Sequence, residues 1–374
     1  MASSKQNGLM QRKVKRIHFV GIGGIGMSGI AEVLINLGYE ISGSDMQSSD
    51  ITKRLKKLGA KVSLGHSAQN VSKADVVVTS TAVRENNPEV VEARRKNIPV
   101  IPRAEMLAEL LKMKFSIAVS GSHGKTTTTS MISTVLAQGG FDPTMVIGGK
   151  LASIGSNARL GDGDLIVAEA DESDGSFLKL SPTIAIITNI DREHLDYYPG
   201  IEEIKDAFLQ FANIVPFYGC TVLCSDDEHV REILPLIKRK VITYGIKYPA
   251  DYTVQDIKFK GNKSVYKVSY RADELGTVEL SVPGMFNIYN SLAAVAVCRE
   301  LKLDLKTIRD GLRNFFGVQR RLEVKGVVSG VTVVDDYGHH PTEIKETLAA
   351  ARHVWKKRLV VVFQPHRFTR TKVL

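Results

Sequence analysis

Two glycine-rich loops constrain the fold of this 374-residue chain most, because each joins a strand-like segment to a helix-like one. The first, Gly21-Ile-Gly-Gly-Ile-Gly26, follows the strand-like segment 16–20 and precedes apolar residues at helical spacing. The second, Gly121-Ser-His-Gly-Lys-Thr126, follows the apolar run 115–120. Strands that alternate with helices through tight glycine turns are typical of parallel sheets with crossover helices. The sequence therefore predicts an α/β fold with a parallel sheet in at least two units.

Length and composition agree with a protein of several globular domains. At about 150 residues per domain, 374 residues suggest two or three domains. The apolar share of 43% and charged share of 24% exclude a disordered or collagen-like chain. No apolar run approaches the roughly 20 residues of a membrane helix, and residues 1–16 have no apolar signal segment. With only three cysteines and hence no disulfide framework, we expect a cytoplasmic protein without membrane insertion.

The pattern of strands and helices divides the chain into three predicted domains, 1–112, 113–322 and 323–374. Residues 252–282 alternate between apolar and polar, which predicts antiparallel strands added to the central parallel sheet. The third unit is expected to contain a strand at 331–334, a helix at 342–357 and a strand at 359–363. Because a parallel strand needs a covering helix and none follows, we expect this third domain to be truncated.

The net charge of +10 is concentrated at the two ends of the chain. Residues 1–112 hold 17 basic and 10 acidic residues, and residues 351–374 hold 7 basic and no acidic ones. Solvated surface charge would explain this pattern, as would two surfaces that face anionic ligands. No nucleic-acid-binding module is visible, so nucleic acid is not expected as a partner.

The first loop matches the dinucleotide-binding pattern G-x-G-x-x-G at Gly21, Gly23 and Gly26, with Asp45 following 19 residues later. Such glycines let the backbone approach a pyrophosphate at a helix N-terminus. The motif indicates an anionic ligand but not which one. NAD(P), another nucleotide, and a tight turn without a ligand all remain open.

The second loop has the character of a shortened phosphate-binding loop. Backbone amides would cradle phosphate oxygens, Lys125 would reach the β- and γ-phosphates, and Thr126 would offer a hydroxyl to Mg²⁺. The first glycine of the usual spacing would fall at Val119, so the loop departs from the standard pattern. A hydride-transfer enzyme has no need of such a loop, whereas an enzyme that uses ATP on a nucleotide-linked substrate needs both loops.

Acidic segments follow two of the central strands, at 168–175 and 189–196. Carboxylates at strand ends suit Mg²⁺, although solvated acidic loops would have the same composition. His194 could bind a metal or a substrate. Basic and histidine-containing segments at 319–321, 335–341 and 364–370 could bind anions or make contacts between domains. The cysteines lack partner ligands at zinc spacing and are interpreted as structural.

Taken together, these motifs resemble the Mur ligase family. The segments that carry the resemblance are Gly121-Ser-His-Gly-Lys-Thr-Thr-Thr128, Glu169-Ala-Asp-Glu-Ser-Asp174, Thr188-Asn-Ile-Asp-Arg-Glu-His-Leu-Asp196 and Gly284-Met-Phe-Asn287. The resemblance covers the chain from about Lys15 to its last residue. It implies a UDP-sugar domain, a central ATPase domain and a Rossmann-like amino-acid-binding domain, working as a monomer or a homodimer.

The resemblance also implies a role for each matching residue. In the first loop and its surroundings, the UDP-sugar would contact Gly21, Gly23, Gly24, Gly26, Met27, Asp45 and Ser80. ATP would contact Gly121, Ser122, His123, Gly124, Lys125, Thr126, Thr127, Asn287, Arg320 and Asp336. The metal would be held by Thr126, Glu169 and His194, and the substrate and amino acid would face His339, His366, Arg367 and Arg370. Catalysis would depend on Lys125, Glu169, His194 and Arg320. The family usually has histidine where this chain has Phe286, just before Asn287.

The first loop and the segment 335–341 narrow the implied reaction. They resemble the branch that joins L-alanine to the lactyl carboxylate of UDP-N-acetylmuramate, using ATP and Mg²⁺, in peptidoglycan synthesis. The implied intermediate is an acyl phosphate, since a free carboxylate is a poor acylating agent. Two alternatives stay open at this point. One is an NAD(P)-dependent oxidoreductase built on the first loop, and the other is a nucleotide-sensing module without catalytic activity.

Overall fold

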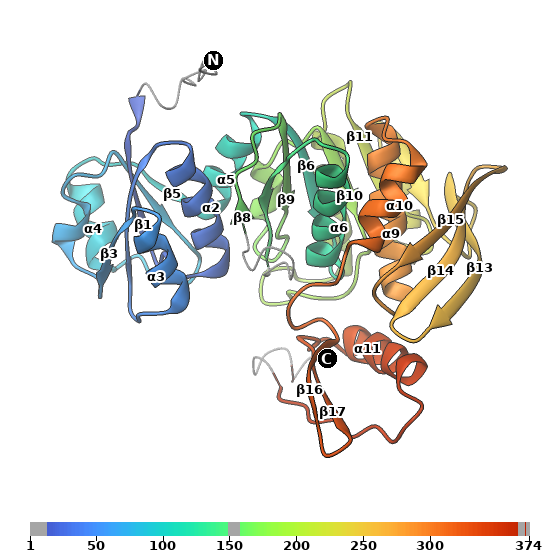
Figure 1. Ribbon diagram of the computed structural model, residues 1–374. Helices are drawn as coiled ribbons and strands as arrows, with labels where there is room; N and C mark the ends of the chain where they lie inside the picture. The colour runs from blue at the N-terminus through green and yellow to red at the C-terminus, as the bar shows by residue number, and fades with distance from the viewer. Residues whose placement is uncertain (1–12, 149–157, 366–370, 372–374) are drawn as a thin grey trace.

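The computed structural model describes residues 13–148, 158–365 and 371, which form three separate sheets (Figure 1). The first sheet lies at the N-terminal end, a ten-stranded sheet occupies the middle, and a hairpin with one helix lies beneath the middle sheet. The predicted three-domain α/β architecture is confirmed in this outline.

The N-terminal sheet is fully parallel, with strand order β3-β2-β1-β4-β5. Its central strands are apolar because helices cover both faces, and four of the five residues of β1 are buried. Its strands are β1 (Arg16–Val20), β2 (Glu40–Asp45), β3 (Lys61–Leu64), β4 (Val76–Thr79) and β5 (Val100–Pro102). Its helices are α2 (Ile25–Asn36), α3 (Asp50–Lys57), η1 (Ala68–Val71), α4 (Pro88–Arg95) and α5 (Arg103–Leu111).

The central sheet has the order β15-β14-β13-β12-β11-β10-β6-β9-β7-β8 and is mixed. Its strands from β9 through β6, β10 and β11 to β12 run parallel, while β13, β14 and β15 form the predicted antiparallel addition. The strands are β6 (Phe115–Ser120), β7 (Thr144–Val146), β8 (Ala158–Arg159), β9 (Leu165–Glu169), β10 (Ile184–Ile187), β11 (Cys220–Cys224), β12 (Lys240–Tyr244), β13 (Tyr252–Lys260), β14 (Lys263–Tyr270) and β15 (Asp273–Leu280).

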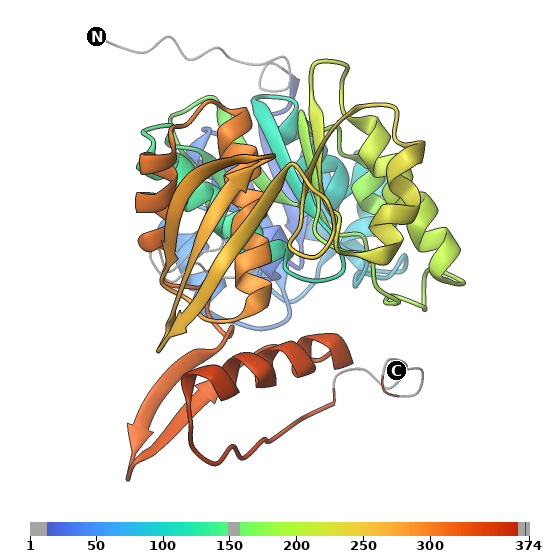
Figure 2. The same ribbon diagram turned by 90° about the vertical axis from the view of Figure 1, so that its right-hand side faces the viewer.

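Helices cover both faces of the central sheet. On one face α6 packs against α9 and α10, and Figure 2 shows α7 and α8 on the opposite face. The α helices are α6 (Lys125–Gln138), α7 (Ile201–Ile214), α8 (Glu228–Ile233), α9 (Met285–Glu300) and α10 (Leu305–Arg313), and the short 3₁₀ turns are η2 (Ser176–Lys179) and η3 (Leu234–Leu236). None of the helices among the described residues is long and apolar enough to cross a membrane.

The C-terminal part differs from the sequence prediction. It consists of an antiparallel hairpin, β16 (Glu323–Val328) and β17 (Val331–Asp335), followed by α11 (Pro341–Val354). The strand expected at 359–363 does not form, and α11 ends three residues before the predicted end at 357. A strand is stabilised by hydrogen bonds to a neighbour, and the described residues 359–363 pair with none. The side chains of Val360, Val361 and Val362 are accordingly exposed.

Candidate active site

The second glycine loop joins β6 to α6 in the manner expected for a phosphate-binding loop. Gly121 and Gly124 have φ angles of +126° and +86°, which favour glycine. Gly124 precedes α6, and no side chain caps this helix. The first amide groups of α6 therefore have no side-chain acceptor and are available to an anion.

Lys125 is the first residue of α6 and lies among carboxylates and carbonyl groups. Its ammonium group donates to the carbonyl of Gly121 at 2.6 Å and contacts Glu172 Oε1 at 2.7 Å. Burial favours the neutral amine, but the charges of Glu172, Glu169 and Asp171 outweigh burial and raise the pKa of Lys125. Lys125 therefore stays charged and is held by an anionic partner.

Thr126 and Glu169, two of the residues predicted to hold the metal, meet beside this lysine. The Thr126 hydroxyl donates to Glu169 Oε2 at 2.9 Å, and the Gly148 amide donates to the same oxygen at 2.8 Å. Burial raises the pKa of Glu169, although the positive charge of Lys125 opposes this. A carboxylate in such a place becomes more stable when a further cation lies beside it.

His194 lies with a second pair of carboxylates. It has a left-handed φ of +56°, and its Nε2 is 3.4 Å from Glu172 Oε1 and 3.8 Å from Glu193 Oε2. One oxygen of Glu172, Oε2, is buried without a hydrogen-bond partner. A hard cation such as Mg²⁺ accepts oxygen ligands of this kind, whereas the imidazole of His194 is an unusual ligand for it. The metal role of Thr126, Glu169 and His194 stays a prediction.

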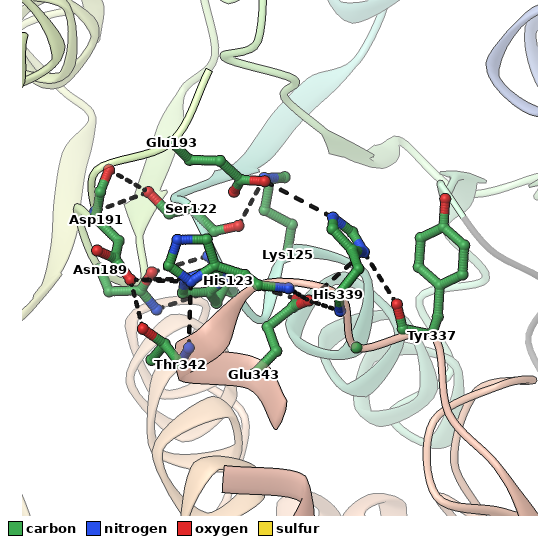
Figure 3. A network of polar contacts seen from close by, with 12 residues as sticks. Ser122, His123, Lys125, Asn189, Asp191, Glu193, Tyr337, His339, Thr342 and Glu343 are labelled. Carbon is green, nitrogen blue, oxygen red and sulfur yellow. Dashed lines mark hydrogen bonds and ion pairs between the residues drawn. The ribbon is translucent and has the colours of Figure 1, made fainter. Parts of the chain in front are cut away.

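His123 connects the phosphate-binding loop to α11 (Figure 3). Its Nε2 is 2.9 Å from Asp191 Oδ2, and its Nδ1 is 3.5 Å from Glu343 Oε1. The Thr342 hydroxyl, in the first turn of α11, donates to the same Asp191 oxygen at 2.8 Å. Burial lowers the proton affinity of His123, but Asp191 and Glu343 raise its pKa to about 9.

This raised pKa predicts a pH-dependent stability. Charged His123 stabilises the fold fully below its ordinary pKa of 6.5, and this contribution is lost as the pH rises through about 9. His123→Gln should therefore lower the free energy of unfolding by about 3 kcal/mol more at pH 6 than at pH 9.5, since one pKa unit is worth roughly 1.4 kcal/mol. Urea denaturation at both pH values measures this difference.

His353→Gln is the matched control for this measurement. His353 is exposed on α11, and its ring nitrogen lies 2.8 Å from the Ala349 carbonyl rather than beside a carboxylate. Its substitution should change the free energy of unfolding by the same small amount at both pH values. An equal loss for His123→Gln at pH 6 and pH 9.5 would contradict the assigned charge on His123.

One cavity of about 700 Å³ brings residues of all three predicted domains together. Gly26 and Arg103 come from the N-terminal sheet domain, and Lys125 comes from the central one. Arg320 also comes from the central predicted domain, and His339 comes from the C-terminal one. Of the other predicted residues it is lined by Ser122, Gly124, Thr126, Glu169 and His194.

A second cavity, of about 570 Å³, also borders the phosphate-binding loop, since Gly124 lines both cavities. It is lined by His123, Thr127, Phe286 and Asp336, and also by the aromatic ring of Tyr289. The lining combines aromatic side chains with polar and charged ones, and aromatic side chains next to a phosphate loop suit a nucleotide base. Predicted Asn287 does not line this cavity, because it is buried and donates to the Pro283 carbonyl at 2.6 Å. Its adenine contact stays a prediction.

The first glycine loop is held to β2. The amides of Gly21 and Ile22 both donate to the Ser44 carbonyl, and the Gly23 amide donates to Asp45 Oδ2 at 2.8 Å. Asp45 is therefore engaged by the loop itself. The other residues predicted for the UDP-sugar lie in different surroundings. Gly24 precedes α2, Met27 is buried in the core, and Ser80 follows β4.

Of the predicted residues that follow α10, Arg320 and His339 line the first cavity and Asp336 lines the second. The Arg320 guanidinium is 3.3 Å from Asp335 and 4.9 Å from the Tyr337 ring centre. His339 Nε2 is 3.7 Å from Glu193 Oε1. Asp336 accepts from the amides of Leu322 and Gly338. The predicted residues His366, Arg367 and Arg370 lie outside the described residues.

Several site residues were not singled out from the sequence. Glu172, Glu193 and Asp191 lie in the two acidic segments, so their strand-end position was the available signal. Arg103 and Glu343 lie in no motif that could have marked them. Arg103 meets Asp171, and Glu343 meets His123, only because the fold brings these distant residues together.

Family models match the chain along most of its length. They are the Mur ligase family catalytic domain over residues 16–115, the Mur ligase middle domain over 119–298, and the Mur ligase glutamate ligase domain over 320–372.

Curated relatives and a solved structure agree with these models. The UDP-N-acetylmuramate–L-alanine ligase of Syntrophus aciditrophicus is 71% identical over 366 residues, which are 98% of this chain and 76% of that protein. The enzyme of the same name from Geotalea daltonii is 60% identical over 98% of this chain and 80% of its own length. The crystal structure of UDP-N-acetylmuramate-alanine ligase from Thermotoga maritima superposes with a TM-score of 0.84 at 34% identity, covering 96% of this chain and 82% of that one.

Proposed function

Because this chain belongs to the Mur ligase family, we propose that it joins L-alanine to the lactyl carboxylate of UDP-N-acetylmuramate in peptidoglycan synthesis, using ATP. The observation that carries the proposal is the shared cavity, in which Gly26 of one phosphate loop faces the same space as Lys125 of the other. Such a space suits a reaction between a nucleotide-linked carboxylate and ATP. We place the domain boundaries near residues 112 and 322.

The chemistry proceeds in two steps. The lactyl carboxylate attacks the γ-phosphorus of ATP, which forms an acyl phosphate and releases ADP. The amine of L-alanine then attacks the acyl carbon, and phosphate leaves from a tetrahedral intermediate while the nitrogen loses a proton. Phosphorylation supplies the leaving group that a free carboxylate lacks.

Lys125 and Arg320 stabilise the transferred phosphoryl group in this scheme. Lys125 is buried and charged, and incoming phosphate oxygens would take the place of its Glu172 partner. Positive charge at this point neutralises the charge that spreads over the phosphoryl oxygens. Mg²⁺, held by Thr126, Glu169 and His194, would supply further charge neutralisation. His339 and the residues predicted beyond it would face the substrate and the amino acid.

The fold also protects the reactive intermediate. The cavity is bounded by all three parts of the chain, and α11 is held to the phosphate-binding loop by His123, Asp191 and Glu343. Closure of these three parts over the substrates would keep water from the acyl phosphate, which would otherwise hydrolyse.

The direct test is phosphate release from ATP in the presence of UDP-N-acetylmuramate, with and without L-alanine. The chain spans 76% of the S. aciditrophicus relative, so the assay uses the protein continued to the length of its relatives. We expect release to depend on all three substrates. Release that does not depend on L-alanine would contradict the proposal. An NAD(P)H titration serves as a control, and saturable binding not displaced by UDP-N-acetylmuramate would favour an oxidoreductase.

A further inference from the structure

We propose that Arg103 binds the diphosphate of the UDP-sugar and is the cationic side chain that the N-terminal domain contributes to this anion. The assignment rests on the proposed function, since it names a residue of the UDP-sugar site. Arg103 belongs to neither glycine loop and is separated from Gly26 by most of the N-terminal domain in sequence.

The fold places Arg103 at the first glycine loop. It is the first residue of α5 and directly follows β5, so it lies at the carboxyl edge of the parallel sheet, where ligands of such sheets bind. An added Cβ at Gly26 would be 2.6 Å from Arg103 Nη1, so the guanidinium lies directly against the loop. Both residues line the large cavity.

The first loop itself carries no cation for a diphosphate. Residues 21–37 contain no Lys, Arg or His, and α2 has no side chain at its N-cap. A helix N-terminus supplies only about half a positive charge, whereas a diphosphate carries at least two negative ones. A fixed guanidinium next to the loop would supply the missing charge and two parallel donors.

The other arginine and lysine side chains that line this cavity among the described residues come from outside the N-terminal domain. They are Lys125, Arg320 and Arg321, which contact Glu172, Asp335 and Glu343. Arg103 also has an anionic partner, since its Nη2 is 3.2 Å from Asp171 Oδ2. Its Nη1 points toward Gly26. One guanidinium nitrogen of Arg103 therefore contacts the central domain, and the other lies against the glycine loop.

The ion pair between Arg103 and Asp171 predicts how a substitution of Asp171 changes UDP binding. Asp171 holds Arg103 between the two domains, and its carboxylate competes with a bound diphosphate for the guanidinium. Asp171→Asn should therefore leave UDP binding unchanged or make it tighter, while Arg103→Met should weaken it.

The test measures the binding of UDP and of uridine to the 374-residue chain by calorimetry or by competition. Arg103→Met should weaken UDP binding about 10- to 100-fold, as expected for the loss of charge-assisted hydrogen bonds. Uridine binding should change by less than about twofold, because uridine has no phosphate. Arg103→Lys should recover part of the loss, since it restores the charge but not the fork.

A second variant changes the same contact at Gly26 instead of at Arg103. Gly26→Ala places a methyl group where Arg103 now lies, and the group that must shift is the end of a flexible side chain. It should weaken UDP binding and leave uridine binding and the melting temperature nearly unchanged. An equal loss of UDP and uridine affinity in Arg103→Met, or no loss for UDP, would overturn the assignment. A wild-type chain that binds uridine but not UDP would overturn it too, whereas wild-type binding of UDP without ligase activity in the phosphate-release assay would refute only the proposed function.

Discussion

Lys125→Ala is expected to reduce L-alanine-dependent phosphate release on the order of 1,000-fold or more. Lys125 begins α6 at the phosphate-binding loop, is buried, and keeps its charge because Glu172, Glu169 and Asp171 surround it. A fixed charge at a transferring phosphoryl group acts mainly on the transition state, and removing one such group typically costs 100- to 1,000-fold or more. The initial rate of phosphate release measures the effect.

The same substitution also disturbs the fold, so stability must be measured separately. Removing Lys125 leaves the buried Glu172 carboxylate without its cation, and an unpaired buried charge costs about 3–5 kcal/mol. The double variant Lys125→Ala with Glu172→Gln should recover much of this stability without recovering activity. Lys112→Ala is the control, because Lys112 is exposed and contacts Glu109 at the surface. A double variant with restored turnover would show that Lys125 has only a structural role.

Gly121→Ala should produce the second large effect, a loss of both ATP binding and stability. Gly121 has a φ of +126°, and a Cβ there would lie 2.1 Å from Thr188 Oγ1 and 2.9 Å from the Thr188 amide nitrogen. Part of this clash is with backbone, so the loop must move away from β10. We expect a loss of about 2–4 kcal/mol in the free energy of unfolding from strain and overpacking together.

Thermal unfolding and ATP titration together test this expectation. ATP affinity should fall at least about tenfold, because the amides of the displaced loop no longer converge on one anion. Gly140→Ala is a suitable control, since it also has a positive φ, of +76°, but no atom within 4 Å of the added Cβ. It should lose stability from strain alone and keep its ATP affinity. Unchanged ATP binding in Gly121→Ala would contradict the role of this loop.

Local sequence determined much of the fold and part of the site. The two strand–glycine–helix units were predictable because a tight turn between a buried strand and a helix depends on neighbouring residues. The antiparallel strands at 252–282 were predictable because alternation with a period of two marks a sheet with one exposed face. The strand at 359–363 was wrongly predicted, because apolar residues form a strand only where a partner strand is available.

What only the tertiary structure decided was which distant side chains meet. The sequence marked Gly26, Lys125, Glu169 and His194 because each lies in or beside a recognisable local motif. It could not pair Arg103 with Asp171, or His123 with Glu343, since the partners lie 68 and 220 positions apart and neither Arg103 nor Glu343 lies in a recognisable motif. Electrostatic contacts depend on distance in space, which the packing of three sheets sets.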